Sequence, residues 1–383
     1  MSLLEGLLVL DFSQYLAGPF AAMRLADLGA RVIKIEREDG GDASRGLTLS
    51  NLKVDGDSTV FHSMNRNKES YAANLKNPDD LLKVKRLVEK ADVLIENFRP
   101  GTMEKFGLEY ESVKRINPKI VYASITGYGA EGPWKDKPGQ DLLVQALSGI
   151  PWLNGTSDQP PMPFGLSAVD MFASANTVQG ILAALVRRGR TGEGGLVETS
   201  LMEAALDLQF EVLTTHLNDG EKLPVRSRLS GAHAYLGAPY GIYETKDGFL
   251  ALAMGSVVRL GELLSCEPLT RYTDPNSWFE QRDEIKAILA SHLRNRPTRE
   301  WLTVLEAGGY WCAEVRTMKE ALHHEGVQAL DMVIEVSRRN GATLRTTRCP
   351  IRIDGERLVS SKASPVLGED TSAIDLELGE AWK

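Results

Sequence analysis

The sequence predicts an α/β protein, with a mostly parallel sheet covered by helices and a smaller α+β unit later in the chain. Over about the first two hundred residues, short apolar, β-branched runs alternate with stretches of helical spacing, which is typical of βαβ units. A hairpin signal and further helical stretches follow a polar, glycine-containing segment. At 383 residues the chain is long enough for two or three domains.

The alternating pattern defines the elements of a large domain, expected at residues 1–217. The expected strands occupy residues 7–12, 31–35, 93–95, 120–125 and 196–199. The expected helices occupy 20–28, 79–90, a short stretch around Met103, 110–115, 140–147 and 167–188, with another from about residue 201. Gly189 and the turn at 192–195 are expected to end the long helix, and residues 151–163, with four prolines, are expected to form a loop.

The second part of the chain is expected to hold a smaller α+β domain at residues 236–325, after a linker at 218–235. Apolar runs at 241–245 and 249–254 flank Lys246-Asp247-Gly248, a hairpin signal in which Gly248 is expected to take a positive φ. Helical spacing recurs at 283–293 and 299–306. Residues 326–383 are expected to be irregular, with an extended stretch at 345–354.

Composition and charge exclude several classes of function. The chain has 44 basic and 52 acidic residues, a net charge of −8, which argues against a general nucleic-acid binder because phosphates require a basic surface. Three scattered cysteines and six histidines outside any metal-ligand spacing predict no disulfide, no metal and a reducing compartment. No signal-peptide pattern opens the chain, so a cytoplasmic location is expected. The uncharged stretch 171–186 falls short of the ~20 residues that a membrane span needs, which predicts a buried helix and no membrane partner.

The first two strand ends provide weak evidence for a nucleotide site. The loop Ser13–Pro19 contains one glycine, Gly18, whereas a dinucleotide fingerprint needs three, so NAD or FAD binding in the usual mode is disfavoured. After the second strand, Glu36 could hold a ribose and Arg37 could pair with a phosphate. Spacing alone favours a solvated strand end at this position.

The segment after the expected strand 93–95 is a second candidate for ligand binding. It lies at the carboxyl end of a parallel strand, where open α/β sheets place ligands. Asn97 can hydrogen-bond in both directions, Phe98 can stack on an adenine, and Arg99 or Lys105 can meet a phosphate. An ordinary strand-to-helix loop, with Pro100 at the helix start, explains the same residues, and spacing does not decide between the two.

Asp170 is the only charged residue between Asp158 and Arg187, and it stands at the start of an uncharged helix. An acid entering an apolar segment is expected to be hydrogen-bonded, paired or functional. Ser167-x-x-Asp170 has the spacing of a helix capping box, and spacing alone favours that structural role. The two roles are compatible, because helix N-terminal amides would keep a carboxylate nucleophile ionised.

Taken together, these segments resemble the class III coenzyme A transferases, also called the CaiB/BaiF family. The resemblance covers nearly the whole chain, and it rests on the order and spacing of short motifs. These are Leu16-Ala17-Gly18-Pro19, residues 25–30 leading to 32–37, Gly41-Asp42, 65–70, 96–101, Gly127-Tyr128-Gly129, Gln140-Asp141, the helix at Asp170, Arg190-Thr191-Gly192, Pro239-Tyr240-Gly241 and 365–369.

The resemblance implies a site, a fold and an assembly. The family's catalytic aspartate matches Asp170, which favours the nucleophile over the capping role. The matching coenzyme A (CoA) positions are Gln14, Tyr15, Ala17, Arg37, Leu75, Asn97, Phe98 and Lys105, with Arg99 added from the reasoning above, and Leu16 and Gln140 are expected in the substrate pocket. CoA is then a co-substrate, and no cofactor is permanently bound. The implied fold is a homodimer of two interlocked rings, whose Rossmann-like large domain includes the C-terminal residues.

The resemblance also implies a mechanism and an alternative. Asp170 is expected to be ionised at neutral pH, since an ordinary aspartate has a pKa of ~3.9, and to carry CoA through an aspartyl thioester and mixed anhydrides. Racemases of the same family, which act on 2-methylacyl-CoA esters, place a histidine where this chain has Gln140. Because glutamine cannot exchange protons at neutral pH, transfer is favoured over racemisation. Leu16 stands where the oxalate enzymes carry a glutamine, and Gly255 stands alone where they have a glycine run, so neither position supports oxalate as the substrate.

Overall fold

The computed structural model describes residues 3–380, and its chain divides into two compact units. The first unit comprises Met1–Val144, Ser167–Leu208 and Ala329–Lys383, and the second comprises Gln145–Leu166 and Gln209–Gln328. The proline-rich segment 145–166 therefore groups with the second unit by its contacts. The domain boundaries expected from the sequence stay a prediction.

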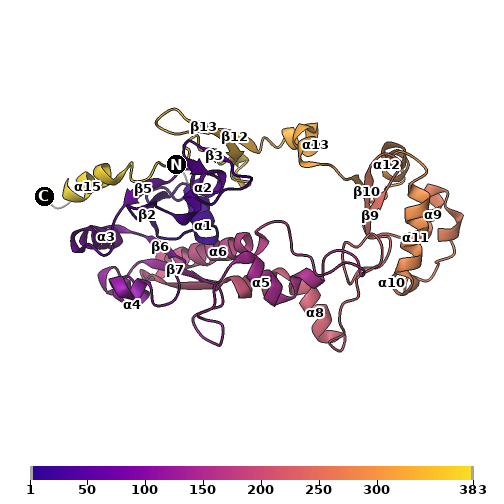
Figure 1. The fold of residues 1–383 in the computed structure, drawn as a ribbon, viewed down its shortest axis with the longest axis horizontal. Coiled ribbons are helices and arrows are strands. Elements are labelled where there is room, and N and C mark those ends of the chain that lie inside the picture. The colour runs from indigo at the N-terminus through magenta and orange to yellow at the C-terminus, as the bar shows by residue number, and fades with distance from the viewer. Residues whose placement is uncertain (1–2, 381–383) are drawn as a thin grey trace. The chain divides into compact units, whose positions relative to one another are not determined.

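The first unit is built on a six-stranded sheet in the order β5-β2-β1-β6-β7-β8 (Figure 1). All five neighbouring pairs are parallel, which confirms the predicted α/β class. The strands are β1 (Leu8–Asp11), β2 (Arg31–Glu36), β5 (Glu69–Ala72), β6 (Val93–Glu96), β7 (Val121–Thr126) and β8 (Gly195–Ser200). The strand order reverses between β1 and β6, and open α/β sheets bind ligands at the carboxyl ends of strands at such a point.

Helices α1 (Ala17–Asp27), α3 (Pro78–Lys90), α4 (Tyr110–Ile116) and α6 (Ala168–Thr191) cover this sheet. The central strands β1, β2 and β6 are almost wholly buried, as expected for a sheet covered on both faces, whereas the edge strand β8 is largely accessible within this chain. Leu10, Ile33 and Leu94 are at most 1% exposed, and they share one core with Val84 and Val88 of α3. The expected helix at 79–90 is confirmed as α3. The helix begins here because Asn77 caps it, accepting a hydrogen bond from Asp79 N (2.9 Å), and because Pro78 is suited to the first helical position.

Helix α6 departs from the prediction at its C-terminal end and in its burial. It continues through Gly189 and ends at Thr191, where Gly192 is the C-cap residue with a φ of 79°. Gly192 stops the helix because its left-handed backbone cannot continue the helical turn, whereas Gly189 keeps helical angles. Among residues 3–380 it is the one helix long and apolar enough to span a bilayer, but only 28% of its most apolar window is buried in this chain. Met171 and Val186 are exposed, so the expected buried helix is only partly buried within one chain.

The second unit contains a three-stranded antiparallel sheet of β11 (Cys312–Glu314), β10 (Phe249–Leu252) and β9 (Gly241–Glu244). Its core includes residues of α9 (Val257–Leu264), α11 (Arg282–Leu293) and α12 (Thr298–Ala307). The predicted hairpin is present, but Gly248 does not adopt a positive φ. A four-residue turn replaces the expected one, with the Thr245 hydroxyl accepting from Gly248 N (3.1 Å) and Thr245 N donating to Gly248 O (2.9 Å).

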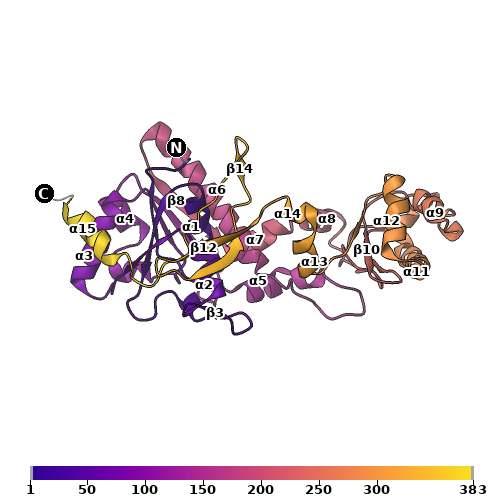
Figure 2. The same cartoon turned by 90° about the horizontal axis from the view of Figure 1, so that it is seen from above.

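The C-terminal segment is more regular than the sequence predicts. Strands β12 (Val333–Ser337) and β13 (Thr343–Thr347) form a hairpin, and helix α15 (Thr371–Glu380) follows. The expected extended stretch at 345–354 holds only in part, because it spans the end of β13 and the two-residue strand β14. Helix α15 packs against α3 (Figures 1 and 2) and against β5 (Figure 1). Asp370 Oδ2 accepts a hydrogen bond from Ser70 N at 2.8 Å. The C-terminal residues thus belong to the first unit.

The remaining elements are short, and most of them connect the larger ones. They are β3 (Lys53–Val54), β4 (Asp57–Ser58), α2 (Thr59–Asn65), α5 (Asp141–Ser148), α7 (Leu201–Leu208), α8 (Phe210–Asn218), α10 (Ser277–Glu280), α13 (Met318–His323), α14 (Glu325–Gln328), β14 (Arg352–Ile353), β15 (Glu356–Arg357) and the 3-10 turns Ala43–Arg45, Met103–Phe106, Ile150–Trp152 and Glu267–Leu269.

Candidate active site

The loops after β1 and β6 meet at the point where the strand order reverses. Asn97, directly after β6, accepts a hydrogen bond from Gln14 N at 2.8 Å and donates one to Gln14 O at 2.7 Å. Gly18 lets the loop after β1 turn back tightly, because a Cβ there would lie 2.2 Å from the Cβ of Ser13. The loops after β1 and β6, which carry expected CoA positions, are therefore joined directly by hydrogen bonds.

A buried cluster of four charged side chains, Asp11, Lys34, Asp42 and Lys68, holds the loop after β1 in place. Lys34 Nζ donates to Ser13 O (2.7 Å) and pairs with Asp42 (2.8 Å), while Lys68 pairs with Asp11 (2.7 Å). Although burial works to lower the pKa of Lys34, the charges of Asp11 and Asp42 hold that pKa above its ordinary value. Burial works to raise the pKa of Asp11, and the two lysines lower it to about 2. Burial lowers the pKa of Lys68 to about 8, and although burial works to raise the pKa of Asp42, the charge of Lys34 holds it below its ordinary value. The cluster is therefore predominantly charged at neutral pH and fixes the loop.

A cavity of about 440 Å³ opens between these loops and the end of β2. Four of the residues predicted to bind CoA line it, namely Gln14, Arg37, Leu75 and Phe98. The other lining residues are Phe12, Ser13, Lys34, Ile35, Glu36, Glu38, Asp39, Gly41, Asp42, Ala73, Asn74, Lys76, Thr102 and Phe106. Arg37 is exposed at the rim, where a guanidinium can pair with a phosphate.

The other predicted binding residues lie around this cavity rather than in its wall. Asn97 acts through Gln14, as described above. Tyr15 has a φ of 64° and donates its main-chain N–H to Asp42 Oδ1 at 3.2 Å, while its side chain is 55% exposed. Ala17 is buried in the first turn of α1. Arg99 and Lys105 are exposed on the segment after β6, so neither lines the cavity in this structure.

Asp170 lies in the first turn of α6, and the structure corrects its expected capping role. Ser167 is the N-cap residue, but its side chain makes no capping hydrogen bond. Asp141 takes that place, with its Oδ2 accepting from Val169 N at 2.8 Å and from Asp170 N at 3.0 Å. The predicted capping box is therefore wrong, and the carboxyl group of Asp170 is not used in it.

The protonation state of Asp170 also differs from the prediction. Burial, and then the negative charge of Asp141, raise the pKa of Asp170 to about 7. The expectation that helix amides keep this carboxylate ionised is wrong, because Asp141 already accepts from those amides and adds a like charge. At neutral pH the group is therefore divided between its acid and its carboxylate form.

Ser174 connects the helix of Asp170 to the loop after β1. Its hydroxyl lies 2.6 Å from Ala17 O and 2.7 Å from Asp170 O, and helices α1 and α6 pack together along this contact. The turn that carries Asp170 is thereby held beside the turn that carries Ala17. Leu16, the N-cap residue of α1, is partly buried, whereas Gln140 before α5 is exposed in this chain.

Sequence reasoning missed Glu96, the last residue of β6 and a second carboxyl group with a raised pKa. Burial raises the pKa of Glu96 to about 7, and its side chain accepts from Phe98 N at 2.9 Å and contacts the Ser124 hydroxyl. Its position next to Asn97, at the end of an apolar strand, was the available signal. Glu96 thus fixes the segment that carries Phe98.

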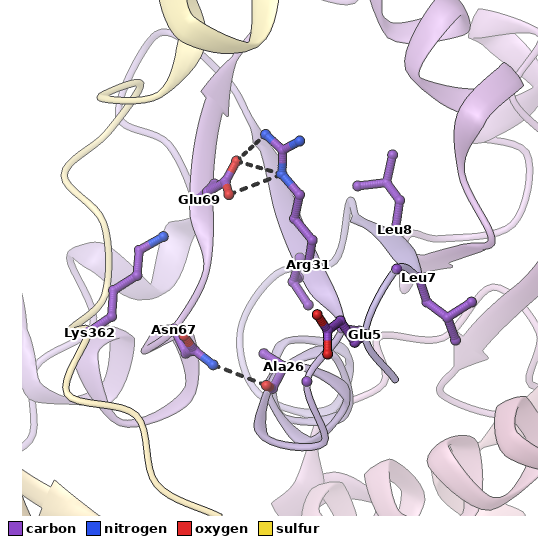
Figure 3. Close-up of a pocket in the computed structure, with 12 residues that line it drawn as sticks. Glu5, Leu7, Leu8, Ala26, Arg31, Asn67, Glu69 and Lys362 are labelled. Atoms are coloured by element: carbon purple, nitrogen blue, oxygen red, sulfur yellow. Dashed lines mark hydrogen bonds and ion pairs between the residues drawn. The ribbon is translucent and has the colours of Figure 1, made fainter. Parts of the chain in front are cut away.

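A second cavity, of about 550 Å³, lies at the opposite edge of the sheet, where β1 and β2 begin. Figure 3 shows that Arg31 points to Glu69 there, and Asn67 donates to Ala26 O. Arg31 is already paired with Glu69 and Glu377, and Glu5 and Lys362 also line this cavity. None of the predicted site residues lines it. Among the described residues, no group of three or more His, Cys, Asp or Glu side chains could hold a metal.

A model of CoA-transferase family III matches residues 4–371. The chain is 34% identical to the succinate–glutarate CoA-transferase of Agrobacterium fabrum, over 98% of this chain and 95% of that protein. It is 33% identical to the acetyl-CoA:oxalate CoA-transferase of Acetobacter aceti, over 97% and 95%.

Solved structures agree with the fold. A CaiB/BaiF family protein from Brucella suis has a TM-score of 0.84 and 31% identity, covering 98% of this chain and 99% of that one. Rv3272 from Mycobacterium tuberculosis has a TM-score of 0.83 and 30% identity, covering 98% and 99%. The likeness therefore extends over both compact units.

Proposed function

The chain belongs to CoA-transferase family III and is a CoA-transferase, and we propose that Asp170 is the nucleophile that carries CoA between the donor and acceptor acids. The observation that carries the proposal is the position of this carboxyl group. Asp170 is partly buried in the first turn of α6, its carboxyl group is left out of the helix cap, and its main chain is held through Ser174 beside the first turn of α1. A carboxylate in poorly hydrated surroundings is more reactive toward an acyl carbon than one in water.

Transfer proceeds in two mirrored halves. In the first, the Asp170 carboxylate attacks the thioester carbonyl, the C–S bond breaks, and a mixed anhydride and the CoA thiolate result. The thiolate attacks the Asp170 carbonyl of this anhydride, releasing the donor acid and leaving an aspartyl-CoA thioester. In the second half, the acceptor carboxylate attacks this thioester, and the released thiolate then attacks the acceptor acyl carbon of the new anhydride. Asp170 leaves as a carboxylate, so no net proton transfer and no metal are required.

The cavity beside Gln14 is the proposed binding site for the nucleotide end of CoA. Arg37 at its rim supplies a positive charge for phosphate, and Phe98 supplies an aromatic face for the adenine. Leu75 adds an apolar wall, while Tyr15, Ala17 and Asn97 shape the loop that borders it. Arg99 and Lys105 are exposed nearby in sequence and would act as further phosphate partners. Leu16 and Gln140 are proposed to contact the acyl group.

A homodimer of interlocked rings, in the cytoplasm, is part of the proposal. Apolar side chains that one chain leaves exposed support the dimer: Leu142 is 53% exposed, Met171 38% and Val186 66%. Large apolar side chains exposed on helices such as α5 and α6 are typical of surfaces that an obligate dimer buries. Light scattering during size-exclusion chromatography measures the mass, and a monomer at micromolar concentration would contradict the dimer.

The proposal is tested by assaying transfer with purified protein. The relatives named above act on succinate, glutarate and oxalate by their names, so dicarboxylic acids and their CoA esters form the first panel. Asp170→Ala and Asp170→Asn are expected to lose transfer while keeping the circular dichroism spectrum of the native protein. Asp79→Asn, which changes an exposed aspartate in the first turn of α3, is the matched control and should keep full activity. Turnover retained in Asp170→Ala, or α-proton exchange in deuterated water without an acceptor acid, would contradict the proposal.

A further inference from the structure

Asp141 meets Asp170 at the start of α6 in a way that transfer alone does not explain. Its Oδ2 accepts hydrogen bonds from two consecutive amides, Val169 N and Asp170 N, and the residue is only 7% exposed. A serine, threonine or asparagine could accept such hydrogen bonds without a full negative charge. The chain instead places a second carboxylate against the turn that carries the proposed nucleophile.

A close backbone contact determines where Asp141 lies. Gly127 follows β7, and after a loop the chain returns at Gly139, where the two glycines pack against each other. A Cβ on Gly127 would lie 2.6 Å from Gly139 Cα, and one on Gly139 would lie 2.5 Å from Gly127 Cα. No other residue fits at either position without moving the backbone. This contact fixes the start of α5 next to the end of β7, so Asp141 reaches the first turn of α6.

The charge of Asp141 acts against the helix terminus. Free N-terminal amides carry a partial positive charge and would stabilise the carboxylate of Asp170. Asp141 accepts from two of those amides and adds a negative charge nearby. The elements packed against α6 carry other charged groups, namely Arg24 and Asp27 on α1, Glu203 and Asp207 on α7, and Glu198 on β8. After burial, Asp141 is the charge that raises the pKa of Asp170.

Resting on the proposed function, we infer that Asp141 is a positioning residue that holds the first turn of α6 by its two hydrogen bonds and, by its negative charge beside that turn, makes Asp170 a more reactive nucleophile. When the surroundings stabilise the charge of a carboxylate less, the carboxylate gains more free energy by bonding to an acyl carbon. The hydrogen bonds supply the geometry and the charge supplies the reactivity, so two substitutions can separate these effects.

Asp141→Asn removes the charge and keeps an oxygen that can accept from both amides. Its melting temperature is expected to stay near that of the native protein, while the acidic limb of the pH profile for the first half-reaction moves down by about one pH unit. The plateau rate is expected to fall roughly two- to threefold, for a Brønsted slope of about 0.4–0.5. Asp141→Glu keeps the charge and should keep the position of the limb. An unshifted limb in folded Asp141→Asn would overturn the inference and leave a capping role alone.

A direct titration covers the case in which Asp141→Asn does not fold. Carbon-13 NMR of aspartate-labelled native protein, with the Asp170 signal assigned by its absence in Asp170→Asn, is expected to show a midpoint near pH 7. A midpoint near the ordinary ~4 would overturn the inference. The two proposals fail separately, because a CoA adduct on Asp170 with an unshifted Asp141→Asn limb contradicts only the role of Asp141. Absence of any adduct in the native protein contradicts the nucleophile itself.

Discussion

Asn97 binds both main-chain polar groups of Gln14, accepting from its N–H at 2.8 Å and donating to its carbonyl oxygen at 2.7 Å. These residues stand 83 positions apart and follow the two central strands β1 and β6. An amide side chain is suited to this contact because it has a donor and an acceptor side by side. The pair joins the two loops at the point where the sheet reverses its strand order. The position of Gln14 in the cavity wall depends on this pair of hydrogen bonds.

Asn97→Ala is expected to weaken acyl-CoA binding. The two lost hydrogen bonds, of about 1 kcal/mol each, release the loop that borders the cavity, so KM for the donor is expected to rise by at most roughly thirtyfold, with a smaller change in kcat. Asn117→Ala is the matched control, since Asn117 donates to Val88 O and Ala91 O away from the site. It should lower stability without changing KM. Equal KM values for the two variants would contradict the role of Asn97.

Lys34→Met is expected to destabilise the first unit strongly. It leaves Asp42 and Asp11 buried without one of their cations, and breaking a buried ion pair costs about 3–5 kcal/mol. The melting temperature is the measurement. Lys83→Met is the control, because Lys83 is 42% exposed where it pairs with Asp375, and such surface pairs contribute at most about 1 kcal/mol. A similar loss in both variants would contradict the supporting role of the buried cluster.

Much of the first unit follows from the sequence, because its core strands are apolar and its helices have clear spacing. The predictions for β1, β2, β6, β7 and β8 are each confirmed within about a residue at either end. Edge strand β5 was missed, since its four residues begin with Glu69 and carry little pattern. Hairpin β12–β13 was missed because only Val336 among the residues of its first strand is buried.

The environment of Asp170 could not be predicted, because it depends on contacts between residues far apart in the chain. Spacing indicated Ser167 as the residue that caps α6. Asp141, which lies 29 residues before Asp170 in the chain, caps it instead. The close approach of Gly127 and Gly139 that positions Asp141 leaves no local signal. Four of the expected CoA positions, Gln14, Arg37, Leu75 and Phe98, line one cavity, because parallel strands bring their carboxyl ends to one edge of the sheet; their binding of CoA stays a prediction.

The first half-reaction is expected to depend on pH around neutrality. Only the carboxylate form of Asp170 attacks, and its pKa is raised to about 7, so the rate should rise from pH 6 and level off above pH 8. Rapid-quench measurement of the donor acid released and of the aspartyl-CoA adduct formed, in single-turnover experiments without an acceptor acid, measures this limb. A rate that is flat down to pH 5 would mean that Asp170 has an ordinary pKa.

Asp170→Asn is expected to stabilise the protein at alkaline pH. Because the folded pKa of about 7 lies above the unfolded value of ~4, the native carboxyl group lowers stability progressively from pH 4 to 7 and by a constant amount above. The full shift corresponds to at most about 4 kcal/mol, and less for a partly buried group. The melting temperature of the variant should exceed that of the native protein more at pH 8 than at pH 5. An equal difference at both pH values would contradict this linkage.

Covalent capture of CoA on Asp170 tests the central claim most directly. The protein is incubated with an acyl-CoA donor without an acceptor acid, quenched in acid, and measured by intact-mass and peptide mass spectrometry. The aspartyl thioester predicts a mass gain of one CoA less one water, located on the peptide that contains Asp170 and absent from Asp170→Asn. Transfer activity in the same preparation without such an adduct, or an adduct on another residue, would contradict the account.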